Sequence, residues 1–140
     1  MVDIFVEYQG DLHCLAKHGP SASVLATDAP LDNQGRGESF SSTDLVAAAL
    51  GTCMATVMGI AARKRGFALE GTRVHVKKVM TKQPPRRIAE LIVQVTFPKA
   101  VTLSVGPARA ELEHEADHCP VRLSLLDAVV VPTHFDWQTE

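Results

Sequence analysis

The sequence has few cysteines and no surplus of charge of either sign. It holds 3 cysteines among 140 residues, and so small and odd a number of thiols excludes a secreted disulfide scaffold. The 14 basic and 16 acidic residues give a net charge of −2, which leaves no excess of cations for non-specific binding to a phosphate backbone. We therefore expect no nucleic-acid partner.

Several motifs of known chemistry are also missing. The sequence contains no glycine-rich phosphate loop, no G-x-S-x-G and no H-E-x-x-H, so it gives no sign of a nucleotide site, a serine hydrolase or a zinc protease. The first residues, MVDIF, lack a basic segment followed by an apolar run, and no signal peptide is visible. We expect a cytoplasmic protein with reduced thiols and no bound cofactor.

The length and the order of the apolar patterns predict one domain over residues 1–140, of the α+β class with mainly antiparallel sheet. Alternating apolar residues predict strands at residues 4–8, 12–16, 23–27, 72–80, 88–97 and a last one over 129–131 and 133–137. Helices are expected over 45–65, over 107–118 with a start as early as Val101, and over 120–126. The residues Ser42-Thr43-Asp44 supply an N-cap and an early acid for the first of them.

The long helix is apolar enough to lie either in a membrane or in a protein core. Leu45 to Ala62 runs without a charged residue and ends on Arg63-Lys64-Arg65, as a membrane span with a positive flank does. The run is short for a bilayer and consists mostly of Ala, Gly, Thr and Met, so we predict a core helix and no membrane partner. Its large apolar residues cover more than one face, and the chain has only 5 Phe, 1 Tyr and 1 Trp to close around it. We therefore predict a homodimer with this helix near the shared core.

The three cysteines have different surroundings in the sequence. Cys53 lies within the apolar helix, where a free cysteine behaves as a small hydrophobic residue. Cys119 precedes Pro120, which suits the first position of a helix, so Cys119 is expected at an N-cap that favours its thiolate. Neighbouring His118 and Arg122 would add positive charge there. Cys14 lies in a predicted strand and is interpreted as structural.

Two uses of these thiols are consistent with the residues alone. Cys53 and Cys119 would form a redox pair, one attacking a peroxide and the other resolving the sulfenic acid as a disulfide. In the other interpretation a zinc ion binds some of a set of six residues, namely His13, Cys14, His18, His114, His118 and Cys119. The second has poor ligand spacing, since no C-x-x-C pair occurs and His114/His118 is the only helical two-ligand unit. We expect no metal site.

Two cysteine contexts occur in a specific order, STDLVAAALGTC at 42–53 and HCPV at 118–121. Together with YQGDL at 8–12 and TDAP at 27–30, they resemble the OsmC/organic hydroperoxide resistance family over essentially the whole chain. The resemblance implies a thiol-dependent peroxidase on an intertwined α+β homodimer, with mainly antiparallel sheets and a long central helix. It implies that Cys53 attacks an organic hydroperoxide and that Cys119 resolves the oxidised Cys53 as a disulfide, with an external dithiol as reductant.

The resemblance also implies an activating pair, a Glu ten residues before the first cysteine and an Arg. Here Thr43 stands at that position with Asp44 beside it, and Arg36 is the nearest arginine in the preceding loop. Asp44 and Arg36 are therefore the candidate replacements. The alternative hypothesis is a non-catalytic OsmC-like dimer that binds a small apolar ligand or senses the thiol redox state.

Overall fold

A computed structural model describes residues 1–139 of the chain. Its contacts divide the chain into two compact units, Met1–Val46 and the residues from Ala47 onward. The boundary falls inside one continuous helix, α1 (Ser42–Lys64).

The first unit is built on a three-stranded antiparallel sheet in the order β1-β2-β3, comprising β1 (Ile4–Gly10), β2 (His13–His18) and β3 (Val24–Asp28). The three strands expected from the alternating pattern are thus confirmed. The loop that follows contains a short 3-10 helix, η1 (Leu31–Asn33). Much of the sheet is uncovered within the chain: Ile4, Phe5, Val6 and Tyr8 are 57–65 % exposed.

The long helix α1 begins with a reciprocal pair of hydrogen bonds. Asp44 N–H donates to Ser41 Oγ at 3.1 Å, and Ser41 N–H donates to Asp44 Oδ2 at 2.8 Å, which is the geometry of a capping box. The N-cap is therefore Ser41, one residue before the segment expected to supply it. At the other end Arg63 and Lys64 occupy the last turn and Gly66 follows at φ 78°, a conformation that glycine adopts without strain.

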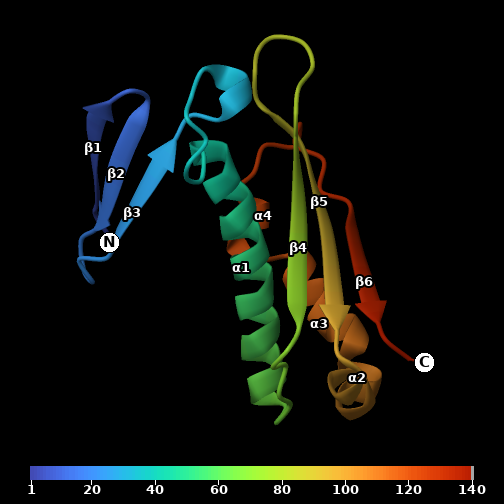
Figure 1. Ribbon diagram of the computed structural model, residues 1–140. Helices are drawn as coiled ribbons and strands as arrows, with labels where there is room; N and C mark the ends of the chain where they lie inside the picture. The colour runs from blue at the N-terminus through green and yellow to red at the C-terminus, as the bar shows by residue number, and fades with distance from the viewer. Residues whose placement is uncertain (140) are drawn as a thin grey trace. The chain divides into compact units, whose positions relative to one another are not determined.

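The second unit holds another three-stranded sheet, in the order β4-β5-β6 (Figure 1). The strands are β4 (Arg73–Met80), β5 (Ile88–Phe97) and β6 (Thr133–Trp137). β4 pairs antiparallel with β5, whereas β6 pairs parallel to it. Of the expected last strand, residues 133–137 form β6 and residues 129–131 do not join it, apart from a single bridge between Val130 and Glu90.

The segment between β5 and β6 differs from the two helices expected there. It forms α2 (Lys99–Val105), the 3-10 turn η2 (Gly106–Ala108), α3 (Arg109–Asp117) and α4 (Pro120–Leu123). Gly106 has φ 51° and ψ −121°, outside the helical region, and Pro107 follows it. The helix expected over 107–118 is therefore confirmed as α3 in most of its length, but it does not continue back to Val101. The short helix after Cys119 ends at Leu123, before Leu126.

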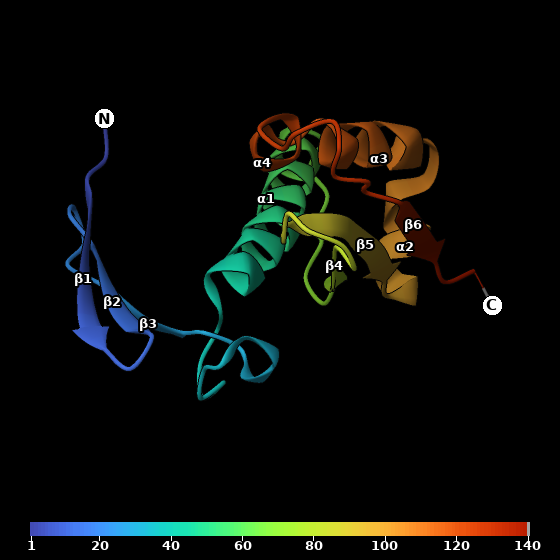
Figure 2. The same ribbon diagram turned by 90° about the horizontal axis from the view of Figure 1, so that it is seen from above.

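One face of the second sheet carries the core of this unit. Figures 1 and 2 show α1 and α3 side by side on that face. The inward side chains of β5 are fully buried while Ile92 and Gln94 point to the other side, as the period of two predicts. Fully buried large residues are contributed by α1, β5 and α3: Leu50, Met54, Met58, Leu91, Val93, Val95, Phe97 and Leu112. This packing holds the middle of α1 and the end of α3 in one layer.

Candidate active site

Cys119 lies in a short turn between α3 and α4. It is the N-cap of α4, with an extended backbone (φ −64°, ψ 148°) and Pro120 at the first helical position, as expected from the Cys-Pro sequence. Its Sγ accepts a hydrogen bond from the backbone N–H of Arg122 at 3.5 Å. The side chain is fully buried, so the turn presents this thiol to the interior of the unit.

The structure brings Cys53 and Cys119 together. Cys53 is half-buried on α1, in the turn next to the buried Gly51 and Met54. Its side chain lies close enough to the thiol of Cys119 to influence the Cys119 pKa. Both thiols are free. The two cysteines are far apart in the sequence, and within the second unit they are direct neighbours.

Burial raises the pKa of the Cys119 thiol above its ordinary value. The N–H groups of Arg122 and Val121 act in the opposite direction, because they stabilise the thiolate, while the neighbouring Cys53 raises the pKa further. The expectation from the N-cap position, a thiolate favoured at neutral pH, is therefore wrong. Loss of water around a fully buried sulfur outweighs the two N–H dipoles.

Arg122 and His118, the two residues expected to add positive charge beside Cys119, are engaged elsewhere. Arg122 Nη1 donates to Thr133 Oγ1 at 3.0 Å and lies 3.3 Å from Asp117 Oδ1 as an ion pair. That buried carboxylate oxygen has no hydrogen bond within residues 1–139, so the guanidinium is its charge partner. His118 Nδ1 bonds to the carbonyl oxygen of His114 at 2.8 Å, and the two rings lie 4.0 Å apart.

Asp44 and Arg36 both lie in the first unit. Asp44 forms the capping box of α1 with Ser41. Its Cα is nine residues from that of Cys53 along the same helix, a rise of about 14 Å. Arg36 Nη2 lies 3.8 Å from Asp28 Oδ1. Their proposed roles as an activating pair stay predictions.

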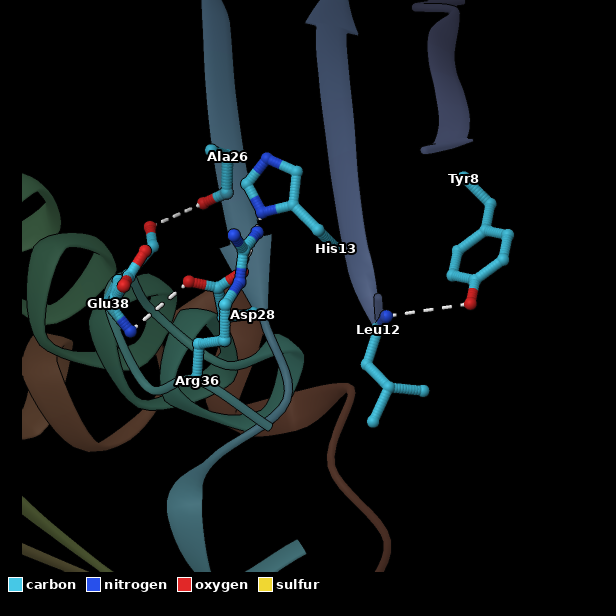
Figure 3. A network of polar contacts seen from close by, with 8 residues as sticks. Tyr8, Leu12, His13, Ala26, Asp28, Arg36 and Glu38 are labelled. Atoms are coloured by element: carbon cyan, nitrogen blue, oxygen red, sulfur yellow. Dashed lines mark hydrogen bonds and ion pairs between the residues drawn. The ribbon is translucent and has the colours of Figure 1, made fainter. Parts of the chain in front are cut away.

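A buried carboxylate in the first unit was not expected from the sequence. Asp28 is 4 % exposed, and its oxygens contact His13 Nδ1 at 2.6 Å and the N–H of Glu38 at 3.1 Å, with Arg36 beside them (Figure 3). The hydrogen bond from His13 is the main reason why the pKa of Asp28 is lowered. His13 and Asp28 pair across β2 and β3. The sequence could have indicated their contact only if the register of these two strands had been known.

Cys14 also belongs to β2 in the first unit and is half-buried. Among residues 1–139, no cluster of three or more His, Cys, Asp or Glu side chains is arranged to hold a metal ion. Of the six residues considered as zinc ligands, His13 bonds to Asp28 and His118 to a backbone carbonyl. In the second unit, Cys53 and Cys119 are both free thiols.

Comparisons with known proteins identify the family to which this chain is similar. The sequence profile of the OsmC-like protein family matches residues 35–134, whereas no match is found among curated proteins. A crystal structure of a putative osmotic stress induced and detoxification response protein from Psychrobacter arcticus is similar, with 38 % identity, a TM-score of 0.88 and 96 % of each chain covered.

Two further solved structures share the fold at low identity. An organic hydroperoxide resistance protein OsmC from Legionella pneumophila has 13 % identity and a TM-score of 0.75, with 97 % of this chain and 96 % of that chain covered. A putative organic hydroperoxide resistance protein from Vibrio cholerae, with captopril bound in one of its active sites, has 14 % identity and a TM-score of 0.75, with 97 % and 91 % covered. The profile match and the 38 % identical structure place this chain in the OsmC-like protein family.

Proposed function

We propose that this protein is a thiol-dependent peroxidase that reduces organic hydroperoxides, with Cys53 as the attacking and Cys119 as the resolving thiol. The observation that carries the proposal is the proximity of these two free thiols, close enough for Cys53 to influence the Cys119 pKa. A peroxidase of this type needs a second thiol within reach of the first, so that the sulfenic acid is converted to a disulfide before it is oxidised further.

The reaction proceeds in two displacements. The Cys53 thiolate attacks one peroxide oxygen, so that an S–O bond forms, the O–O bond breaks and the alcohol leaves after taking up a proton. Cys119 sulfur then attacks Cys53 sulfur, an S–S bond forms and water leaves. The two thiols supply the two electrons that reduce the hydroperoxide, and an external dithiol restores them by exchange.

The protonation of Cys119 supports this order of events. Its raised pKa leaves it mostly as the thiol at neutral pH, and peroxide attack requires a thiolate. The interaction with Cys53 is one of the causes of that raised pKa. Conversion of Cys53 to a neutral sulfenic acid removes any thiolate charge beside Cys119, which favours ionisation of Cys119 at the moment when it has to attack.

Apolar surface on α1 supports an organic substrate. Val57, one turn from Cys53, lines a small hollow of about 130 Å³ between α1 and α3, together with Ile60 and Ala61. Its rim carries Lys64 and the carboxylates of Glu111 and Glu115. An alkyl group is bound more favourably by such apolar side chains than hydrogen peroxide is.

A homodimer is part of the proposal. By length and composition α1 is apolar enough to cross a membrane, and only 39 % of its most apolar window is buried. Its uncovered side carries Thr52, Ala55, Thr56 and Ile60, which have no charge. A second copy of the chain would cover this surface and that of the first sheet.

Light scattering at micromolar concentration should give twice the chain mass of 15.1 kDa. A monomer, or protein that floats with lipid vesicles, contradicts the proposed homodimer.

Hydroperoxide consumption tests the function directly. With dithiothreitol as reductant, the wild type should consume cumene hydroperoxide through many turnovers, and Cys53→Ser should consume none. Cys119→Ser should turn over more slowly and accumulate over-oxidised Cys53, because its sulfenic acid has no resolving thiol within the protein and waits for dithiothreitol. Cys14→Ser is the matched control, since Cys14 lies in the other unit, and it should keep the wild-type rate. Consumption that survives in Cys53→Ser, or that is missing in the wild type while all thiols titrate as free, contradicts the proposal and favours a ligand-binding or thiol-sensing role.

A cytoplasmic location, where dithiol reductants are available, belongs to the same proposal.

A further inference from the structure

The turn that holds Cys119 is closed by a side chain. Asp117 lies two residues before the cysteine and Arg122 three residues after it, and their ion pair of 3.3 Å joins the two ends of the turn. Between them, Pro120 fixes one backbone angle and Cys119 Sγ accepts the N–H of Arg122. The thiol thus lies inside a six-residue loop, 117–122, with both ends tied together.

The same guanidinium ties this loop to the sheet. Arg122 Nη1 donates to Thr133 Oγ1 at 3.0 Å, and Thr133 is the first residue of β6, paired with Val93 of β5. Val93 is fully buried in the layer that also receives α1. Through Thr133, the side chain of Arg122 therefore fixes the position of the Cys119 loop relative to the core on which the Cys53 helix packs.

We propose that Arg122 is a positioning residue for the resolving step: its side chain holds the Cys119 thiol at the place from which it reaches Cys53. The inference rests on the function proposed above and adds to it a residue that touches neither the peroxide nor Cys53. Attack on a sulfenic acid requires the incoming sulfur to approach in line with the S–O bond that breaks, so a displacement of about 1 Å is enough to slow it strongly.

The side chain acts through position and not through charge. Its positive charge is paired with Asp117, and the stabilisation that Arg122 gives to a Cys119 thiolate comes from its backbone N–H. A substitution of the side chain leaves that N–H in place. It removes only the two anchors, to Asp117 and to Thr133, so the expected defect is confined to the encounter of the two sulfurs.

Arg122→Met tests the proposal, with Arg65→Met as the matched control. Arg65 also forms an ion pair, with Glu111 on the surface of the same unit, and no described contact joins it to Cys53 or to the loop 117–122. Arg122→Lys is the conservative variant, since one ammonium group can keep one anchor. Two quantities are measured in each protein: the rate at which Cys53 is first oxidised by cumene hydroperoxide, and the equilibrium of the Cys53–Cys119 disulfide with glutathione.

In Arg122→Met, we expect disulfide formation against glutathione to fall by about tenfold or more, while the first oxidation of Cys53 changes by less than about twofold. Excess hydroperoxide should then convert more Cys53 to the sulfinic acid, and Arg122→Lys should recover part of the disulfide. Arg65→Met should match the wild type in both quantities and in the yield of sulfinic acid. An unchanged glutathione equilibrium in Arg122→Met overturns the proposal, as does an equal fall in both quantities.

A second variant covers the case in which Arg122→Met does not fold. Thr133→Val keeps the shape of the side chain and removes only the hydroxyl anchor, and it should also weaken the disulfide with glutathione. If it leaves the disulfide at the wild-type level, the anchoring role is wrong. The glutathione equilibrium needs no peroxide, so it decides on Arg122 even if the wild type fails to reduce hydroperoxides, and the two proposals can fail separately.

Discussion

Gly51 lies on the side of α1 that packs against β4, and one added methyl group there tests how closely the helix that carries Cys53 rests on the sheet. A Cβ at this position would lie 3.1 Å from Val76 Cγ2 and 3.5 Å from Val74 Cγ1. Carbon atoms in packed cores are separated by about 3.5–4.0 Å. The contact with Val74 is therefore ordinary, whereas the contact with Val76 is tight and requires that side chain or its neighbours to shift by a few tenths of an ångström.

Two effects of Gly51→Ala oppose each other. Alanine is favoured over glycine inside a helix by about 1 kcal/mol, and overpacking of a well-packed core costs about 1–3 kcal/mol. In the wild-type background we therefore expect the substitution to lower the free energy of unfolding by up to about 2 kcal/mol. In a Val76→Ala background the short contact is gone, and the same substitution should raise the free energy of unfolding by about 1 kcal/mol.

Urea unfolding of the four proteins, followed by circular dichroism at one protein concentration, gives the coupling between the two positions. With a denaturant slope of about 2 kcal/mol per molar urea, 1 kcal/mol corresponds to a midpoint shift of about 0.5 M. Gly51→Ala should leave or lower the midpoint alone and raise it together with Val76→Ala. An equal rise in both backgrounds would refute the close packing of α1 on β4 and the placement of Cys53 that depends on it.

Three further predictions concern protonation and backbone shape. Disulfide formation from the Cys53 sulfenic acid should accelerate as the pH rises above 7, because the raised pKa of Cys119 leaves a thiolate fraction that grows about tenfold per pH unit; a flat profile in quenched-flow mass spectrometry contradicts the raised pKa. The lowered pKa of Asp28 contributes stability that is present above the unfolded value of about 3.9 and is lost as the pH falls through the folded value. Acid titration of unfolding should therefore show a steeper loss below about pH 4 in the wild type than in His13→Gln, and identical curves would contradict the pairing. Gly35→Ala should disrupt the loop after β3, because its Cβ would lie 1.7 Å from the carbonyl oxygen of Ala29; amide exchange at Gly37, whose N–H bonds to that oxygen, should rise, and unchanged protection would show that the loop is not closed there.

The elements with a local signature could be predicted from the sequence. The period of two gave β1 to β5, and it assigned Leu91, Val93 and Val95 to one face and Ile92 to the other, as found. The uncharged run from Leu45 gave α1. The parallel pairing of β6 with β5 could not be predicted, since a strand's partner is chosen by tertiary packing and leaves no mark on its own pattern.

In the candidate site too, the features with a local sequence signature could be predicted and those set by tertiary packing could not. The two cysteine contexts pointed to Cys53 and Cys119, and in the structure Cys53 lies near enough to Cys119 to influence its pKa. The N-cap position of Cys119 was correct, but its pKa was misjudged, because the burial of this side chain is set by tertiary packing and not by its neighbours in the sequence. The anchoring of Arg122 to Thr133 is likewise a contact between segments whose packing no local pattern reveals.

The central claim, that Cys53 and Cys119 act as a redox pair, is tested most directly by the mass of the protein after one equivalent of cumene hydroperoxide. We predict the loss of two hydrogens, with peptide mapping that links Cys53 to Cys119 and leaves Cys14 as a free thiol. An unchanged mass, with all three thiols still free to react with an alkylating reagent, would contradict the claim.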